Sequence, residues 1–231
     1  MPPIRRVRQH VNPLSSKYAL PAGAPNWAEV FANPHLPLHV DIGCGKGDFI
    51  REMAPQMTEW NFLGLEIREP LVERALIRQD LAQRNTQTKE TQPANSHASH
   101  AQQNLHFIFC NVNNSLKSVL ANYPGALTRV SIQFPDPWFK KRHQKRRVVQ
   151  PELVASLAML MPTGGWVWLQ SDIEEVCAQM CDRFSENPAF SRTSPHWLTQ
   201  SPFPAKTDRE QVTEEKGLPV YRALYKRNEV S

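Results

Sequence analysis

The segment from residue 133 to residue 150, "QFPDPWFKKRHQKRRVVQ", combines an acid, an aromatic ring and a dense run of positive charge. Asp136 stands between two prolines, and Lys or Arg fills six of the eight positions from 140 to 147. Because proline fixes its own φ and keeps the preceding residue out of the helical region, we expect an extended backbone at Asp136. The backbone then sets the direction of the carboxylate, which suits an electrostatic role toward a bound substrate.

The basic run indicates a surface that binds phosphates, although the net charge of the whole chain is only +5. Trp138 and Phe139 precede the run, and an unpaired base could stack on either ring. Two other interpretations stay open: the run could be a solvated helix face, and Trp138 could pack in the core. The expected phosphate contacts are Lys140, Lys141, Arg142, Lys145, Arg146 and Arg147.

A second candidate site is the glycine-rich loop "DIGCGKGDF", residues 41 to 49, which begins at Asp41. Gly43 and Gly45 let the backbone approach a ligand that a side chain would block. The spacing is G-x-G-x-G, not the G-x-G-x-x-G of dinucleotide-binding proteins. Because a carboxylate repels a pyrophosphate and attracts an ammonium group, the loop favours S-adenosylmethionine, which carries a sulfonium and an ammonium group but no phosphate.

Two polar residues close the next apolar runs. Glu66 lies near the end of "NFLGLEI" (61–67), where an acid accepts hydrogen bonds from ribose hydroxyls in adenosine-binding sheets. Asn111 lies near the end of "LHFIFCNV" (105–112), where its amide could bind the adenine edge. These residues strengthen the prediction of a cofactor site, whose alternative is an empty strand–helix turn with a surface glutamate.

The elements that position these residues alternate along the chain. Near-continuous apolar runs followed by helical patterns predict an α/β fold with a doubly wound, Rossmann-like, mostly parallel sheet. Residues 218–227 alternate apolar and polar side chains, which predicts an antiparallel edge or penultimate strand at the C-terminus. The expected parallel strands lie within 36–50 and at 61–67, 105–112, 127–134 and 164–172.

The 231 residues suit one domain, which we expect to span residues 36–231. Residues 1–35 are expected to form a basic N-terminal arm and a lead-in helix. The three arginines at positions 5, 6 and 8 could bind nucleic acid or belong to a frayed terminus. Residues 83–104 contain no apolar residues other than alanine and proline, so we expect a disordered polar insertion there.

These motifs resemble the TrmB-type tRNA (guanine-N7-)-methyltransferases. The resemblance covers roughly residues 36–226 and rests on "DIGCGKG", "GLEIR", "FPDPWFKKRHQKRRVVQ", "SD" at 171–172 and "TDRE" at 207–210. It implies the class I methyltransferase fold, with S-adenosylmethionine as cofactor and tRNA as substrate. The implied reaction is methyl transfer to N7 of the guanosine at position 46, in the variable loop of tRNA.

The resemblance also implies roles for individual residues, with Asp136 as the central acid. Asp41 and Asn111 stand where many members carry glutamate and aspartate, so we expect an altered cofactor affinity. "TDRE" departs from the more usual Thr-x-Phe-Glu. The implied cofactor contacts are Asp41, Glu66 and Asn111, and the implied substrate contacts are Lys140, Asp172, Thr207 and Glu210.

The chemistry of guanine limits what Asp136 can do. N7 keeps a free in-plane lone pair, so its methylation needs no prior deprotonation and no general base. We therefore expect Asp136 to accept hydrogen bonds from the Watson–Crick edge of guanine and to orient the base. Its charge would also offset the positive charge that develops on the purine ring.

Other protein classes fit less well. A nicotinamide-linked dehydrogenase would share the sheet but not Asp41, and a non-catalytic RNA-binding subunit would leave the acids without a role. The histidines lack ligand spacing and the four cysteines lack a Cys-x-x-Cys pair, so no metal site is expected. No apolar run approaches the length of a membrane helix. We expect a cytoplasmic enzyme, and both a monomer and a homodimer remain open.

Overall fold

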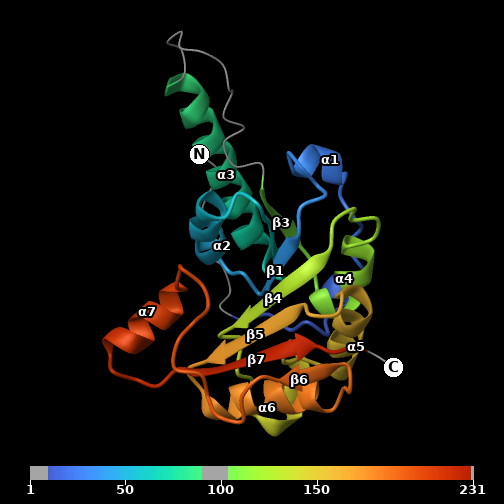
Figure 1. Cartoon of the computed structure of the whole chain (residues 1–231), viewed down its shortest axis with the longest axis vertical. Coiled ribbons are helices and arrows are strands. Elements are labelled where there is room, and N and C mark those ends of the chain that lie inside the picture. The colour runs from blue at the N-terminus through green and yellow to red at the C-terminus, as the bar shows by residue number, and fades with distance from the viewer. Residues whose placement is uncertain (1–9, 90–103, 230–231) are drawn as a thin grey trace.

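A computed structural model describes residues 10–89 and 104–229, which form a seven-stranded sheet with helices on both faces (Figure 1). The strands are β1 (Leu38–Ile42), β2 (Asn61–Glu66), β3 (Leu105–Phe109), β4 (Leu127–Gln133), β5 (Trp166–Ser171), β6 (Phe190–Arg192) and β7 (Tyr221–Arg227). The helices are α1 (Trp27–Val30), α2 (Asp48–Met53), α3 (Glu69–Lys89), α4 (Val112–Val119), α5 (Pro151–Leu160), α6 (Glu174–Ser185) and α7 (Asp208–Glu215). Short 3-10 helices are η1 (Ser16–Tyr18), η2 (Ala54–Gln56) and η3 (Lys141–Arg146).

The strand order is β3-β2-β1-β4-β5-β7-β6. Strands β1 to β5 pair in parallel, whereas β7 pairs antiparallel with both β5 and β6. The predicted Rossmann-like sheet with an antiparallel C-terminal strand is therefore confirmed, and β7 is the penultimate strand. The sequence did not predict β6 at the edge, because three residues are too few to show a periodic pattern.

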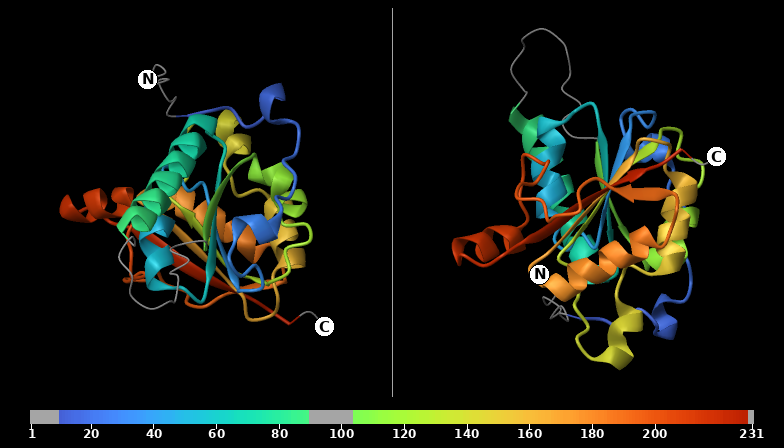
Figure 2. Two further views of the ribbon diagram at one scale, coloured as in Figure 1. Left: turned by 90° about the horizontal axis from the view of Figure 1, so that it is seen from above. Right: turned by 60° about the horizontal axis from the view of Figure 1, so that its bottom comes forward.

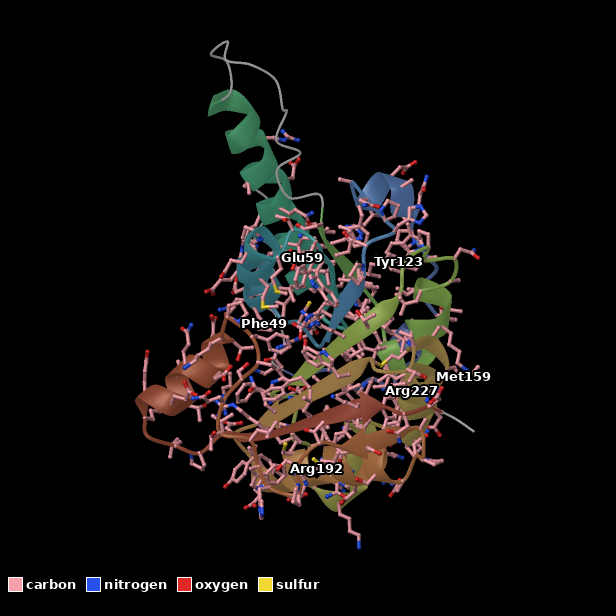
Figure 3. The ribbon with its side chains drawn as sticks, viewed as in Figure 1. Phe49, Glu59, Tyr123, Met159, Arg192 and Arg227 are labelled. Carbon is pink, nitrogen blue, oxygen red and sulfur yellow. The ribbon has the colours of Figure 1, made fainter. Side chains whose placement is uncertain are left out.

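Helices cover the two faces of the sheet, as the edge-on view in Figure 2 shows. One apolar core lies between the sheet and α4, α5 and α6, and the other lies between the sheet and α2 and α3. Every residue of β1 and β2 is buried, since these strands are covered on both sides. Phe49, on α2, packs in the second core against the ring of Phe203, with centroids 5.1 Å apart (Figure 3).

The described part of the N-terminal segment packs against the sheet domain. Trp27 of α1 is buried, and its ring lies 5.0 Å from that of Tyr123 in an edge-on contact. The expected lead-in helix is the four-residue α1, and the three N-terminal arginines lie outside the described residues. Within the described residues, the segment before residue 36 therefore packs against the sheet domain and does not form an independent arm.

The helix before the polar stretch is longer than the sequence indicated. Helix α3 continues to Lys89, so the prediction of disorder from residue 83 onward is wrong for residues 83–89. Polar residues such as Gln, Arg and Lys are good helix formers, and they extend a helix already nucleated on the core. Residues 90–103 lie outside the described residues, and the expectation for them stays a prediction.

Candidate active site

The glycine loop after β1 leaves open space beside its backbone. Gly43, Gly45 and Gly47 have φ values of +78°, +60° and +75°, a region that other residues rarely adopt. A Cβ added at Gly43 would contact nothing within 4 Å, whereas one at Gly47 would lie 2.2 Å from the ring of Phe107. Gly43 therefore borders a space open to a ligand, and Gly47 allows the start of α2 to pack against β3.

Asp41 lies at the carboxyl end of β1. The residue is only 3% exposed, so its carboxylate is buried. Its Oδ1 accepts hydrogen bonds from Ser131 Oγ at 2.6 Å and Gln133 Nε2 at 3.3 Å. Burial raises the pKa of Asp41 to about 6; the two hydrogen bonds oppose the rise and the charge of Glu66 adds to it. His39 Nε2 lies 2.8 Å from Ser131 Oγ and must be the donor, because the hydroxyl proton goes to Asp41.

Glu66 closes β2 with a second buried carboxylate, 2% exposed. Its Oε2 accepts from the amide of Gly45 at 2.9 Å and from Arg68 Nη2 at 2.9 Å. Its Oε1 accepts from the amide and the Nε of Arg68, at 2.9 and 3.0 Å. A carboxylate has about four lone-pair sites, so a further donor, such as a ribose hydroxyl, has to share or replace the Arg68 bonds.

Asn111 precedes α4 and caps it. Its side chain accepts from the amide of Asn113 at 3.3 Å, and its Nδ2 donates to the carbonyl of Pro13 at 3.1 Å. The side chain thus ties the N-terminal segment to the end of the sheet. Asn111 remains in the wall of the cleft, but its amide is already engaged with the protein.

Asp136 lies in a loop with unusual backbone angles. Phe134 and Trp138 both have positive φ, +47° and +42°, which is strained for large side chains. The carboxylate of Asp136 is half-buried, with 38% of the side chain exposed, and its Oδ1 lies 2.8 Å from His10 Nδ1. The central acid is therefore held by the chain on both sides and by a histidine from the N-terminal segment.

Two adjoining cavities open along the carboxyl edge of the parallel strands. Glu66, Asn111 and Asp136 line one of them, while Asp41 and residues 207–209 line the other. The residues shared by both cavities are Gly43, Arg68, Gln133 and Phe134. The fold thus brings residues from β1, β2, β3 and the loop after β4 to one cleft.

Most of the basic run is exposed, on and beside η3. Arg146 differs, because its guanidinium lies 5.0 Å from the ring centroid of Trp138. The ring of His143 also meets that tryptophan, 5.8 Å away and edge-on. Trp138 is therefore covered by its own segment, while Phe139, 66% exposed, is the ring open to solvent. The exposed cations are Lys140, Lys141, Arg142 and Lys145.

The predicted phosphate contact of Arg147 would require its side chain to leave its partners in the protein. Its side chain is only 4% exposed, and each of its guanidinium nitrogens has a protein acceptor. These acceptors are the carbonyl of Pro137, the amide of Gln179 and the carboxylate of Glu175, each at 2.7 Å. The charge count does not reveal that the chain turns inward at the end of the run, toward the buried Val149.

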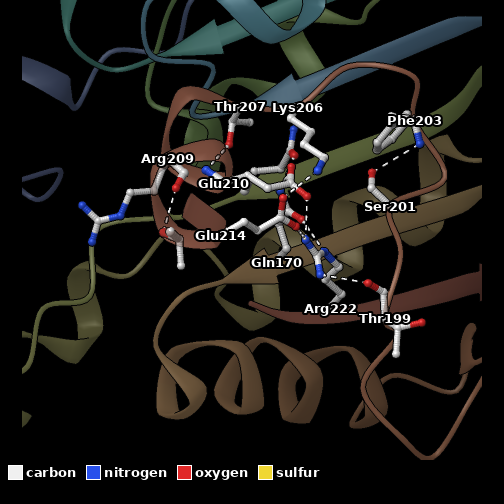
Figure 4. Close-up of polar contacts among 12 residues, drawn as sticks. Gln170, Thr199, Ser201, Phe203, Lys206, Thr207, Arg209, Glu210, Glu214 and Arg222 are labelled. Carbon is white, nitrogen blue, oxygen red and sulfur yellow. Dashed lines mark hydrogen bonds and ion pairs between the residues drawn. The ribbon is translucent and has the colours of Figure 1, made fainter. Parts of the chain in front are cut away.

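The other three implied substrate contacts, Asp172, Thr207 and Glu210, differ in their surroundings, and Figure 4 labels Thr207 and Glu210. Asp172 accepts from Arg209 Nε at 2.8 Å, and Thr207 caps α7 by accepting from the amide of Glu210 at 3.1 Å. Glu210 has no exposed surface and pairs with Arg222 at 2.7 Å. The substrate contact implied for Glu210 would require its carboxylate to leave Arg222 and become exposed. Thr207 lines the cleft, and its implied substrate contact stays a prediction.

Sequence reasoning missed several polar residues of the site. It assigned no role to His10, to Arg68 within "GLEIR", or to Arg222. It also passed over Gln133 and Gln170, which are buried and hydrogen-bonded to each other. The only available signal was a glutamine within each of two otherwise apolar runs, "VSIQF" and "VWLQS".

The cleft fits S-adenosylmethionine. Asp41 has hydrogen-bond donors, but no cationic side chain of the described residues forms an ion pair with it, which suits a ligand that brings an ammonium group. Gly43 borders the open space that such a ligand needs. The carboxylate oxygens of Glu66 can accept hydrogen bonds from hydroxyl groups if the hydroxyl groups share these oxygens with Arg68.

Within residues 10–89 and 104–229, no cluster of three or more His, Cys, Asp or Glu side chains could hold a metal ion. No helix in the same ranges combines the length and the apolar character that crossing a membrane requires.

Solved structures of low sequence identity share the fold. The 16S rRNA methyltransferase KamB superposes with a TM-score of 0.58 at 10% identity, covering 90% of this chain and 96% of that chain. A 16S rRNA (adenine(1408)-N(1))-methyltransferase from Catenulisporales acidiphilia, solved with cosubstrate SAM, gives 0.52 at 13% identity, covering 88% and 90%. These similarities establish the class I methyltransferase fold.

Sequence relatives are much closer. Residues 35–223 match the family described as "Putative methyltransferase". The chain is 51% identical over 228 residues to the tRNA (guanine-N(7)-)-methyltransferase of Trichormus variabilis, with 97% of each chain covered. It is also 51% identical over 221 residues to the protein of that name from Synechococcus elongatus, with 95% of each chain covered. The chain belongs to the TrmB family, the tRNA (guanine-N7-)-methyltransferases.

Proposed function

We propose that this protein transfers the methyl group of S-adenosylmethionine to N7 of a guanosine in tRNA, at position 46 in the variable loop. The observation that carries the proposal is that Glu66 and Asp136 line one cavity. An acid suited to a ribose and an acid suited to a base thus border the same space. Relatives with about half of their residues identical carry the name of this activity.

The cofactor would lie along the carboxyl ends of β1, β2 and β3. Asp41 would bind the ammonium group, Gly43 and Gly45 would admit the ligand close to the backbone, and Glu66 would accept from the ribose hydroxyls. Asn111 would form the wall beside the adenine. Once bound, the cofactor supplies an electrophilic methyl group, whose transfer leaves the bond's electron pair on sulfur as a neutral thioether.

Asp136 would act on the guanine and not on the cofactor. Its Oδ1 is engaged by His10, which leaves Oδ2 to accept from the N–H groups of the Watson–Crick edge. The guanine N7 lone pair forms the new bond to carbon, and the purine ring gains a positive charge. The negative charge of Asp136 offsets that charge in a partly buried site, where electrostatic effects are larger than in water.

The tRNA backbone would contact the exposed cations after Asp136. Lys140, Lys141, Arg142 and Lys145 are exposed, and each neutralised phosphate strengthens binding at low salt. Thr207, which lines the cleft, and Asp172, which accepts from Arg209, would be further contacts. The reaction would take place in the cytoplasm, which suits four cysteines that are all free thiols.

The test is the transfer of labelled methyl from S-adenosylmethionine to total tRNA, followed by nucleoside analysis. We expect the label in 7-methylguanosine with the wild type and its loss with Asp136→Ala. A transcript whose variable-loop guanosine is replaced by adenosine should accept no label. Label in another nucleoside would contradict the proposal, and binding of tRNA and S-adenosylhomocysteine without transfer would indicate a non-catalytic RNA-binding subunit.

A further inference from the structure

A row of long polar side chains crosses the sheet from β4 to β7. Gln133 on β4 pairs with Gln170 on β5, which in turn pairs with Arg222 on β7. Directly opposed residues project from the same face of a sheet, so the three side chains lie side by side. All three are buried. Because buried polar groups are costly unless they are hydrogen-bonded, the partners of this row define what it does.

The hydrogen bonds of the row connect two carboxylates. Gln133 donates through Nε2 to Asp41 at 3.3 Å and accepts at Oε1 from Gln170 Nε2 at 2.8 Å. Gln170 Nε2 also donates to Glu210 Oε2 at 3.0 Å, and its Oε1 accepts from Arg222 Nε at 3.4 Å. Arg222 Nη2 donates to the other oxygen of Glu210 at 2.7 Å (Figure 4). Each amide is held in one orientation, because reversing it would direct an oxygen at a carboxylate.

Helix α7 is attached to the interior of the sheet through this row, and two further ion pairs, Arg209–Asp172 and Asp208–Lys46, join it to loops. Only Glu210 and Thr213 of its residues are buried, and neither is apolar. Val212, its one large apolar side chain, is 43% exposed. The helix projects from the body of the protein in Figure 1. The carboxylate of Glu210, rather than an apolar face, therefore anchors α7 to the sheet.

Of the two carboxylates that the row connects, Asp41 lines a cavity and Glu210 directly follows residues that line the same cavity. Asp41 lines it from β1, and residues 207–209, directly before Glu210, line it from the start of α7. A path of four direct hydrogen-bonded side chains thus leads from the acid of the glycine loop to the segment on the opposite wall. The members of this path are Asp41, Gln133, Gln170 and Glu210.

We infer that Gln133 and Gln170 are positioning residues that couple the binding of a cationic ligand at Asp41 to the docking of α7. The inference rests on the proposed function for the identity of the ligand, S-adenosylmethionine. The residues act through Asp41 and Glu210 and touch neither the reacting methyl group nor the base. Binding of the cofactor would then order the wall that receives the tRNA.

The coupling follows from the order that a ligand imposes on Asp41. Because a pKa of about 6 leaves this carboxylate largely ionised at neutral pH, an ammonium group acts by fixing its position and not by ionising it. A carboxylate that is fixed in place also fixes the amide of Gln133 and, through it, the amide of Gln170. Because coupling between sites is reciprocal, an α7 that is held in place must also favour the ligand at Asp41.

The test compares hydrogen exchange of α7 with and without S-adenosylhomocysteine, whose ammonium group is retained. In the wild type we expect the ligand to slow exchange of the amides of residues 208–215 several-fold. In the double variant Gln133→Met/Gln170→Met, which removes the link and keeps both carboxylates, we expect no such slowing. Equal slowing in the wild type and the double variant would overturn the inference.

One control variant and two further variants of the link separate the loss of this link from general damage to the protein. Asn61→Leu removes another buried amide, which bonds Asn33 and Tyr123 at the far end of the sheet, and it should leave the slowing of α7 unchanged. Glu210→Gln should abolish it. If the double variant does not fold, Gln133→Asn, shorter by one methylene, should still weaken the slowing, and an unchanged response would overturn the inference.

The outcomes also separate the two proposals. A wild type that binds no S-adenosylhomocysteine would overturn the proposed function and this inference together. A wild type that methylates tRNA and binds the ligand without slowing exchange in α7 would overturn the inference alone.

Discussion

The cofactor side and the substrate side of the cleft differ in the burial of their acids and in the partners of those acids. Asp41 and Glu66 are almost fully buried at strand ends, with donors arranged around them. Asp136 lies in a loop with 38% of its side chain exposed, and the cations after it project into solvent. The proposed cofactor side is therefore organised by the protein itself, whereas RNA would order much of the proposed substrate side.

This difference separates binding of the cofactor from catalysis. Groups fixed in a buried site need no rearrangement when charge develops or a ligand arrives, but exposed charges are screened by salt and gain order only on binding. Changes on the cofactor side should therefore alter affinity for the cofactor, and changes on the substrate side should alter turnover or affinity for tRNA. Single substitutions on each side, assayed for both cofactor affinity and turnover, test that separation.

The largest effect is expected from Asp136→Asn. The amide keeps the size of the side chain but loses the negative charge, so we expect turnover to fall about 10²- to 10³-fold, as for loss of one electrostatic stabiliser. Affinity for S-adenosylhomocysteine should change less than about twofold. Single-turnover methylation and calorimetry measure the two quantities. Asp182→Asn, an exposed acid on α6, is the matched control and should change neither.

Equal losses of turnover and cofactor affinity in Asp136→Asn would contradict the separation. They would mean that the loop after β4 helps to hold the cofactor and that the two sides form one binding unit.

The next largest effect is expected from Glu66→Gln. The amide has fewer acceptor sites and leaves Arg68 beside a neutral group, so cofactor affinity should fall about 10- to 100-fold, or about 1.5–3 kcal/mol. Turnover at saturating cofactor should change less than about threefold. Isothermal titration with S-adenosylhomocysteine measures the affinity. Arg68→Met, which keeps the carboxylate and removes its competing side-chain donors, should reduce the affinity less.

A fall in saturated turnover as large as that of Asp136→Asn would reassign Glu66 to the reaction itself. The result would also show that burial alone does not distinguish the two sides.

The sequence predicted the positions of Asp41 and Glu66 correctly, because the ends of strands determine them. Asp41 and Glu66 end apolar runs, and parallel strands bring such ends to one edge. The five parallel strands and the antiparallel β7 follow from the same apolar patterns. The pattern cannot show that Glu66 is surrounded by Arg68 and Gly45, since those contacts depend on how the loop folds.

The substrate side was harder to predict, because residue type does not reveal burial outside regular elements. Arg147 and Glu210 look like surface charges in the sequence, yet the first is 4% exposed and the second has no exposure. Each is buried because a partner far along the chain, Glu175 or Arg222, neutralises it. Long-range ion pairs of this kind need the tertiary structure.

A smaller effect is expected when the pH is lowered, and it concerns the cofactor side alone. Burial raises the pKa of Asp41 from 3.8 to about 6, so the empty folded protein binds this proton more readily than the unfolded chain. From this group alone, the free energy of unfolding rises as pH falls from about 6 to about 4. A cationic ligand needs the ionised form, so affinity for S-adenosylhomocysteine should fall about tenfold per pH unit below about 6.

The matched variant is Asp41→Asn, which should bind the ligand more weakly than the wild type at pH 7 and lose less affinity between pH 7 and pH 5. Calorimetry at several pH values measures both proteins. A wild type whose affinity stays constant down to pH 5 would contradict the assignment of Asp41 to the ammonium group.

The smallest effects are expected in the basic run, where they distinguish exposed from buried charge. Lys141→Ala should weaken tRNA binding a few-fold and reduce the slope of log affinity against log salt by about one. Arg147→Met should leave the slope unchanged and lower the melting temperature, because it removes three buried hydrogen bonds, worth about 1–3 kcal/mol together. Filter binding across a salt series and thermal unfolding measure the two effects. A reduced slope in Arg147→Met would mean that the loop opens on RNA and that this arginine exchanges its protein partners for phosphates, which would move the boundary of the substrate side inward.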